Sequence, residues 1–139
     1  MAAPHHAPLT RTHYISVERL GWVTRGEFFA QVELSVFPSV RAEPFGLVVA
    51  EAQYAGAPFV ISDAGALPEV AGFNHPWVSP AGDAEALASV VEQALIGTQD
   101  AVIAAAQLRW KTHFSPTAGR TRLASFLKTI DIDRITRRT

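Results

Sequence analysis

The amino-acid sequence predicts an α/β fold in which a parallel sheet is flanked by helices. Short apolar segments of strand length alternate along the chain with segments of helical character. The strand segments are apolar throughout, which is typical of strands that are buried on both faces of a parallel sheet. The chain has 139 residues, of which 48% are apolar, so it is long enough for one domain with a substantial core.

The first half of the expected fold runs from a strand to a longer helix. Residues 14–20 are a predicted strand, residues 25–31 a short helix and residues 34–38 a short buried strand. Residues 46–54 are predicted as a helix because Gly56 stands where a left-handed C-cap is expected.

The second half continues the alternation. Residues 58–62 and 77–79 are predicted strands, and residues 67–71 form a helical turn between them. A strong helix is expected from Asp83 to about Ile96, since an aspartate favours a helix start. Its apolar residues recur at a spacing of four, at Leu87, Val91 and Leu95.

Two helices are expected to end the fold. The first covers residues 100–113. Ser115 is predicted to cap the second, and Pro116 suits its first turn, where a missing N–H is tolerated. The apolar residues expected on one face of this last helix are Leu123, Phe126, Leu127 and Ile130.

Composition excludes several classes of protein. The chain has 12 Lys and Arg residues against 13 Asp and Glu residues, and a broad nucleic-acid surface requires a basic excess. It has no cysteine, so a disulfide framework or a cysteine-based metal site is excluded. No apolar run has the length of a signal peptide or a membrane span, so we expect a cytoplasmic protein without a transmembrane segment.

The two ends of the chain are expected to be tails. Residues 1–13 predict a flexible tail, in which His5 and His6 lack the further ligands that a metal site needs. Residues 131–139 predict a basic, solvated tail. The folded domain is therefore expected to cover residues 14–130.

The segment between Glu43 and Glu51 is the strongest functional signal. Pro44 suits a first helical turn, and Gly46 would let a ligand approach the backbone closely. The N-terminus of the helix would attract a phosphate. Since Glu51 lies about 7.5 Å further along the helix, a nucleoside diphosphate would place phosphate at Gly46 and ribose at Glu51. The alternative is an ordinary buried helix with Glu51 in solvent.

Other chemistry-bearing residues have structural interpretations that we prefer. Asp63 and Glu69 are expected to cap or support a loop, and the single histidines His75 and His113 to be partly packed or exposed. Trp22 and Trp77 are expected to be apolar anchors beside turns, with base stacking by Trp22 as the less favoured alternative.

Taken in order, six motifs resemble the C-terminal domain of retaining family-4 glycosyltransferases of the GT-B type. They lie within residues 16–126, and the late His113-Phe114-Ser115 also matches the family. The motifs are Leu20-Gly21-Trp22-Val23, Glu33 to Ser39, Glu43 to Glu51 (the EX7E motif), Ala55 to Pro58, Ser62 to Glu69 and Ser79 to Ala88.

The resemblance implies a Rossmann-like domain that holds a nucleotide sugar without a metal or other cofactor. It would place Glu43 beside the donor sugar and its anomeric carbon, and Glu51 on the ribose hydroxyls. The remaining donor-binding residues that it implies are the backbone of Phe45, Gly46 and Leu47, the base loop at Gly21 and Trp22, and the strand end at Pro38 and Ser39.

The sequence departs from the family pattern in three ways. Gln53 stands where the family often has methionine, and Ala66 replaces a common second glycine. The family's N-terminal domain and the Arg and Lys that stabilise the leaving diphosphate have no counterpart here, so the chain alone is expected to be a poor catalyst. One alternative is a non-catalytic remnant or subunit that self-associates or docks to a separate N-terminal half, and another is a truncated reading frame of a longer enzyme.

A second glycosyltransferase signal near the end of the chain is disfavoured. The segment Asp131-Ile132-Asp133 spells a D-x-D motif that binds metal and diphosphate in a different glycosyltransferase fold. That motif requires the end of a strand inside a nucleotide site, whereas this segment follows a predicted helix.

Overall fold

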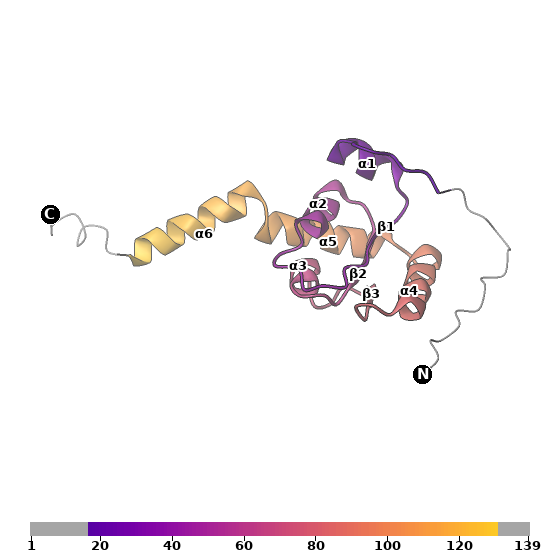
Figure 1. Cartoon of the computed structure of the whole chain (residues 1–139). Coiled ribbons are helices and arrows are strands. Elements are labelled where there is room, and N and C mark those ends of the chain that lie inside the picture. The colour runs from indigo at the N-terminus through magenta and orange to yellow at the C-terminus, as the bar shows by residue number, and fades with distance from the viewer. Residues whose placement is uncertain (1–16, 131–139) are drawn as a thin grey trace.

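The computed structural model describes residues 17–130 and shows a mixed α/β fold around a small parallel sheet (Figure 1). The sheet has three strands in the order β1-β2-β3, and both strand pairs are parallel. Its strands are β1 (Ser35–Phe37), β2 (Phe59–Ser62) and β3 (Val78–Ser79). The helices are α1 (Arg25–Gln31), α2 (Leu47–Ala55), α3 (Leu67–Ala71), α4 (Ala84–Ile96), α5 (Asp100–His113) and α6 (Pro116–Thr129).

The central strand β2 divides the core into two layers. All four of its residues are buried, as a strand between two neighbours requires. Phe59 and Ile61 point toward the layer of α2, α3 and α5, whereas Val60 packs with Trp77 and Ala94 on the side of α4. The alternation follows from the two-residue period of a strand. Helices therefore cover both faces of the sheet, as the sequence predicts.

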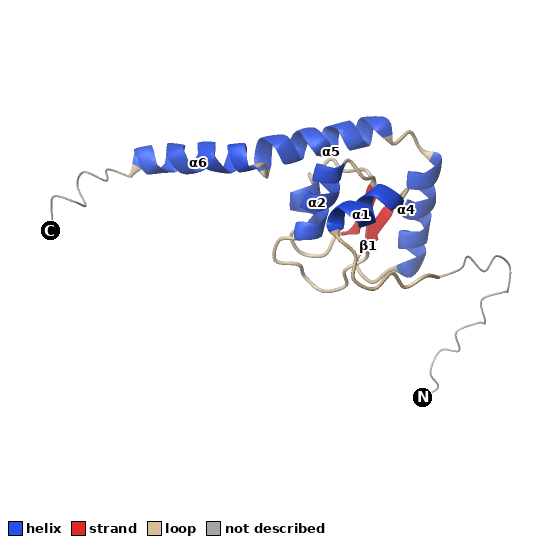
Figure 2. Cartoon of the chain, turned by 90° about the horizontal axis from the view of Figure 1, so that it is seen from above, coloured by secondary structure: helices blue, strands red, loops and turns tan. Residues whose placement is uncertain are grey.

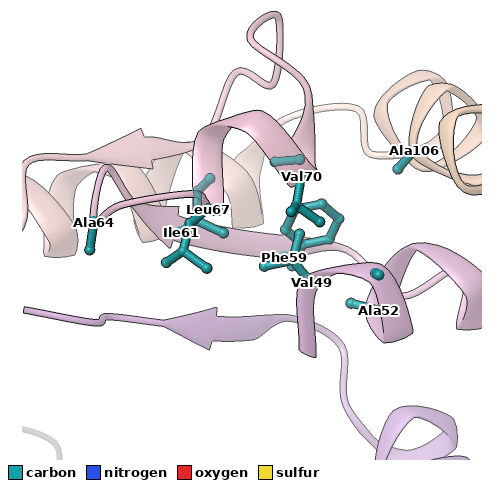
Figure 3. Packing of buried hydrophobic residues seen from close by; sticks show 10 residues of the cluster. Val49, Ala52, Phe59, Ile61, Ala64, Leu67, Val70 and Ala106 are labelled. Atoms are coloured by element: carbon teal, nitrogen blue, oxygen red, sulfur yellow. The ribbon is translucent and has the colours of Figure 1, made fainter. Parts of the chain in front are cut away.

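The larger core layer joins the sheet to α2 and α3. Figure 3 shows Phe59 of β2 between Val49 of α2 and Val70 of α3, with Leu67 close by. All four side chains are almost fully buried. Burial of an apolar side chain of this size stabilises a fold by about 1.5–3 kcal/mol, so this cluster holds α2 firmly against the sheet.

Helix α6 lies outside both layers. Figure 1 and Figure 2 show it continuing from the end of α5 and projecting away from the sheet. None of its residues is buried, and the large side chains Leu123, Phe126 and Leu127 of the expected apolar face are exposed. Its start is well defined, because the Ser115 hydroxyl accepts a bond from the N–H of Ala118.

Most predicted elements are confirmed within one or two residues at their ends. Capping explains much of this agreement: the Asp83 carboxylate accepts the N–H of Ala86, and Gly56 ends α2 with φ 70°. Thr24 and Glu27 form a capping box at α1, and the two bonds from Thr24 hold the pKa of Glu27 below its ordinary value.

The predicted strand at residues 14–20 is wrong where it can be checked. Residues 17–20 are exposed and form no strand. No described strand lies beside them to complete a hydrogen-bond ladder. Trp22 is also not the expected anchor, since its side chain is fully exposed, whereas Trp77 is buried. Residues 14–16, both predicted tails and the D-x-D segment lie outside the described residues.

Candidate functional site

The loops after the three strands meet along one edge of the sheet, because parallel strands end on the same side. The Ser62 hydroxyl at the end of β2 donates to the Ser39 carbonyl at 2.6 Å, which joins the first loop to the second strand. The Asp63 N–H donates to the Ser79 carbonyl at 2.9 Å, and the Ala81 N–H donates to the Asp63 carboxylate at 2.7 Å. The carboxyl edge is where open α/β sheets bind ligands.

Glu43 is held in this edge by its backbone and its side chain. Its carbonyl accepts the N–H of Ala66 at 2.9 Å within an isolated parallel bridge to Gly65. The Ser39 hydroxyl donates to the Glu43 carboxylate at 3.0 Å. Gly65 has φ 61°, and a Cβ there would lie 2.5 Å from both the nitrogen and the oxygen of Glu43. Glycine at 65 therefore permits the close contact that positions this carboxylate.

Gly46 has a role that differs from the sequence-based expectation. It is the N-cap of α2 with φ 81°, and it is buried. A Cβ at this position would lie 2.4 Å from Cδ2 of Leu67, so the room beside Gly46 is filled by Leu67. The left-handed residue also stops the helix from extending backward, and Pro44 consequently lies outside the helix, contrary to the prediction for its first turn.

The start of α2 presents backbone amides without a side-chain acceptor. No side chain caps this helix, and its first turn holds no acidic residue. The amides at a helix start carry the positive end of the helix dipole and favour an anion. Phe45 and Leu47 are exposed on either side of Gly46, and the ring of Phe45 meets that of Phe114 edge-on at 5.7 Å.

Glu51 lies one turn and a half along the same helix, in a hollow of the surface. Its side chain is 21% exposed and forms an ion pair with Arg25 at the start of α1, which is 73% exposed. On one side is a hollow of about 400 Å³, in which the aromatic residues are Phe45, Tyr54, Trp110 and Phe114. On the other side is a hollow of about 420 Å³, which is lined by Phe29 and, again, by Tyr54. Glu51 is therefore not directed into bulk solvent.

The remaining predicted site residues fall into two groups. Pro38 lines a small hollow of about 150 Å³ at the strand ends, and Ser39 holds both Glu43 and Ser62. By contrast, Gly21 and Trp22 are exposed, and a Cβ at Gly21 would have no atom within 4 Å. Their assignment to the nucleotide base stays a prediction.

Residues outside the predicted site that could in principle act in catalysis have structural roles instead. The His75 ring stacks on Phe59 at 4.4 Å, and its Nε2 lies 2.9 Å from the Phe59 carbonyl. Burial lowers the pKa of His75, and the bond to that carbonyl opposes the shift. Asp63 supports a loop, as expected. Within residues 17–130, no group of three or more His, Asp or Glu side chains is arranged to hold a metal ion.

Sequence reasoning missed Arg25. Twenty-six positions separate it from Glu51, and only the tertiary contact between α1 and α2 brings the two side chains together. The capping box at Thr24 and Glu27 predicts where α1 starts, but it does not predict which neighbour the first residue of the helix meets.

Among the described helices, none is long and apolar enough to cross a lipid bilayer.

A family comparison decides the relationship of this chain to known proteins. The model of the glycosyl transferases group 1 matches residues 4–96, well over half of the chain. The chain belongs to this glycosyltransferase family. No curated protein matched it. Among solved structures, sucrose-phosphate synthase from Thermosynechococcus elongatus is similar, with a TM-score of 0.64 and 24% identity.

That structural similarity covers 74% of this chain and 26% of the synthase chain. The chain thus spans about a quarter of that structural neighbour. At this identity, the likeness shows the fold alone, which is a GT-B type Rossmann-like domain with a parallel sheet and flanking helices.

Proposed function

We propose that this chain is the donor-binding part of a retaining glycosyltransferase. It would bind a nucleotide diphosphate sugar, whose glycosyl group passes to a hydroxyl acceptor. The observation that carries the proposal is the arrangement on and before α2: Glu43 is held at the carboxyl edge, Gly46 starts an uncapped helix, and Glu51 lies in a hollow of that helix. Family membership supports the same reaction class.

Each part of a nucleotide sugar has a matching group along this path. The diphosphate would accept hydrogen bonds from the backbone amides at Gly46 and Leu47, where the helix dipole favours negative charge. The ribose hydroxyls would donate to the Glu51 carboxylate, and for this Arg25 would have to share or release it. The sugar would lie beside Glu43 and Phe45.

Glu43 would act on the donor sugar without becoming a covalent nucleophile. Its carboxylate already accepts the Ser39 hydroxyl, which fixes its orientation. A carboxylate beside the anomeric carbon would stabilise the positive charge that develops as the diphosphate leaves. An acceptor hydroxyl that attacks from the side of the leaving group would retain the anomeric configuration.

Titration calorimetry tests the binding part of this proposal. UDP, GDP and ADP sugars are titrated separately into the protein, and one base is expected to give measurable binding below millimolar concentration. Glu51→Ala should weaken that binding roughly ten- to hundredfold, since it removes a charged acceptor of hydrogen bonds worth about 1.5–3 kcal/mol. Glu33→Ala, at an exposed glutamate outside the site, serves as the matched control.

Two results would contradict the proposal. The first is no binding of any of the three donors at millimolar concentration, and the second is a Glu51→Ala protein that binds as tightly as the wild type. We further propose that the donor needs no metal, so the addition of EDTA should leave the affinity unchanged. A loss of binding in EDTA would contradict the metal-free part alone.

A further inference from the structure

Helix α3 connects the candidate site to the interior of the protein. The helix has only five residues, and a helix this short is not stable in water by itself. Just before it, Gly65 forms a parallel bridge with Glu43, and the Ala66 N–H donates to the Glu43 carbonyl at 2.9 Å. The position of α3 therefore determines where Glu43 lies, and something else must hold α3.

The other end of α3 is held by side chains of two neighbouring helices. The last carbonyls of a helix have no partner within it, so they need partners from elsewhere. Gln53 of α2 donates from Nε2 to the carbonyls of Val70 and Ala71, at 3.0 and 3.2 Å. Arg109 of α5 donates from Nε to the Val70 carbonyl at 2.9 Å and from Nη2 to the Glu69 carbonyl at 2.5 Å. Two side chains thus bind three consecutive carbonyls.

The burial of Gln53 indicates that its bonds to α3 matter. Its side chain is fully buried, and its Oε1 atom has no hydrogen-bond partner among the described residues. A buried amide oxygen without a partner destabilises a protein. Methionine, which the family often has at this position, would fill the space without that cost. The donor nitrogen, and with it the hold on α3, is what glutamine adds.

Gly72 makes room for Arg109 at the same end of the helix. Gly72 follows α3 with φ 101°, and its N–H donates to the Pro68 carbonyl at 2.9 Å. A Cβ at Gly72 would lie 3.1 Å from Cδ and 3.2 Å from Nε of Arg109. The guanidinium therefore packs closely against the end of the helix, where the helix dipole also favours a positive charge.

We propose that Gln53 and Arg109 are positioning residues for Glu43. They hold α3 by its C-terminal carbonyls, and α3 in turn holds the Glu43 backbone at its other end. At a rise of about 1.5 Å per residue, α3 is only about 7.5 Å long, so a shift of one end moves the other. Neither side chain lies at the candidate site, and the part of the inference that concerns the donor rests on the proposed function.

Hydrogen exchange followed by NMR tests the inference without any donor. The Ala66 amide reports the contact at the start of α3, and the Ile61 amide, which donates within the sheet, reports opening of the central strand. In Gln53→Met/Arg109→Met, the Ala66 amide should exchange at least about tenfold faster relative to the Ile61 amide, because the loss of four hydrogen bonds lets α3 detach alone.

Single variants keep the test valid if the double variant does not fold. Gln53→Met should give a smaller increase of the same kind, and Ala66 should exchange more slowly in Arg109→Lys than in Arg109→Met, because lysine can still donate to one carbonyl. Gln107→Met, at an exposed glutamine of α5, is the matched control and should leave both amides unchanged. An Ala66 amide that exchanges at the wild-type rate in these variants, or that accelerates only as much as Ile61, would overturn the inference.

Calorimetry tests the consequence for the donor. The nucleotide sugar is compared with the nucleoside diphosphate of the same base, since only the sugar would lie beside Glu43. Gln53→Met/Arg109→Met should weaken binding of the nucleotide sugar about tenfold more than that of the nucleoside diphosphate, whose phosphates and ribose would meet α2. Equal losses for both ligands would overturn the positioning of Glu43. If neither ligand binds the wild type, the proposed function fails, and the exchange rates still decide whether the two side chains hold α3.

Discussion

Replacement of Gly46 by alanine tests how the start of α2 is built. An alanine at φ 81° would bear a backbone strain of about 1–2 kcal/mol. Its Cβ would also lie 2.4 Å from Cδ2 of Leu67, which is 1% exposed and has no free space to enter. Overpacking of this kind costs about 1–3 kcal/mol. Gly46→Ala should therefore lower the free energy of unfolding by about 2–5 kcal/mol.

The assay is urea denaturation followed by tryptophan fluorescence, to which the buried Trp77 contributes a signal from the core. Gly82→Ala is the matched control, because Gly82 has φ 84° and a Cβ there would have no atom within 4 Å, so it isolates the strain from the clash. The double variant Gly46→Ala/Leu67→Ala removes the clash. Its loss in free energy of unfolding should therefore be smaller than the sum of the losses measured for the two single variants. A Gly46→Ala loss equal to that of Gly82→Ala would refute the packing argument.

Three further predictions follow from individual contacts. Gly65→Ala should cost more stability than Gly82→Ala and also weaken donor binding, because its Cβ would displace the Glu43 backbone; calorimetry and denaturation of the same protein check both effects. Burial lowers the pKa of His75 in the folded protein below the ordinary value of 6.5. Below pH 6.5 the unfolded chain therefore binds more protons than the folded one, and the free energy of unfolding should fall as the pH drops through 6.5. His75→Phe keeps the stack on Phe59 and should flatten this part of the stability–pH profile. An unchanged profile would contradict the assignment of the pH dependence to His75. Asp83→Ala removes the cap of α4 and should cost about 1 kcal/mol in denaturation, and no loss would show that the cap is dispensable.

Local signals in the sequence are sufficient to predict most of the fold. Asp83, Ser115 and Gly56 each satisfy backbone groups at a helix end, and such capping depends only on nearby residues. The apolar run of β2 predicts a strand buried on both faces. The prediction for residues 17–20 fails for the opposite reason, because a strand forms only where a neighbouring strand supplies its hydrogen bonds.

The candidate site is predictable in its residue types but not in its contacts. The spacing of Glu43, Gly46 and Glu51 points to one helix start; in the structure Glu43 precedes α2, Gly46 is its N-cap and Glu51 lies within it, and their roles toward a donor stay predictions. Sequence reasoning did not predict the packing role of Gly46, because only the tertiary fold brings Leu67 against it; close approach of a ligand to Gly46 stays a prediction. The pairing of Arg25 with Glu51 joins helices that are distant in sequence, and no local pattern predicts it.

The contact between Glu51 and ribose can be measured most directly by a thermodynamic cycle. The nucleoside diphosphate that binds best and its 2′,3′-dideoxy analogue are each titrated into the wild type and into Glu51→Ala. We predict that the wild type prefers the ribose form about tenfold and that Glu51→Ala binds the two forms equally. Equal binding of both forms by the wild type, or an undiminished preference in the variant, would contradict the assignment of Glu51 to the ribose.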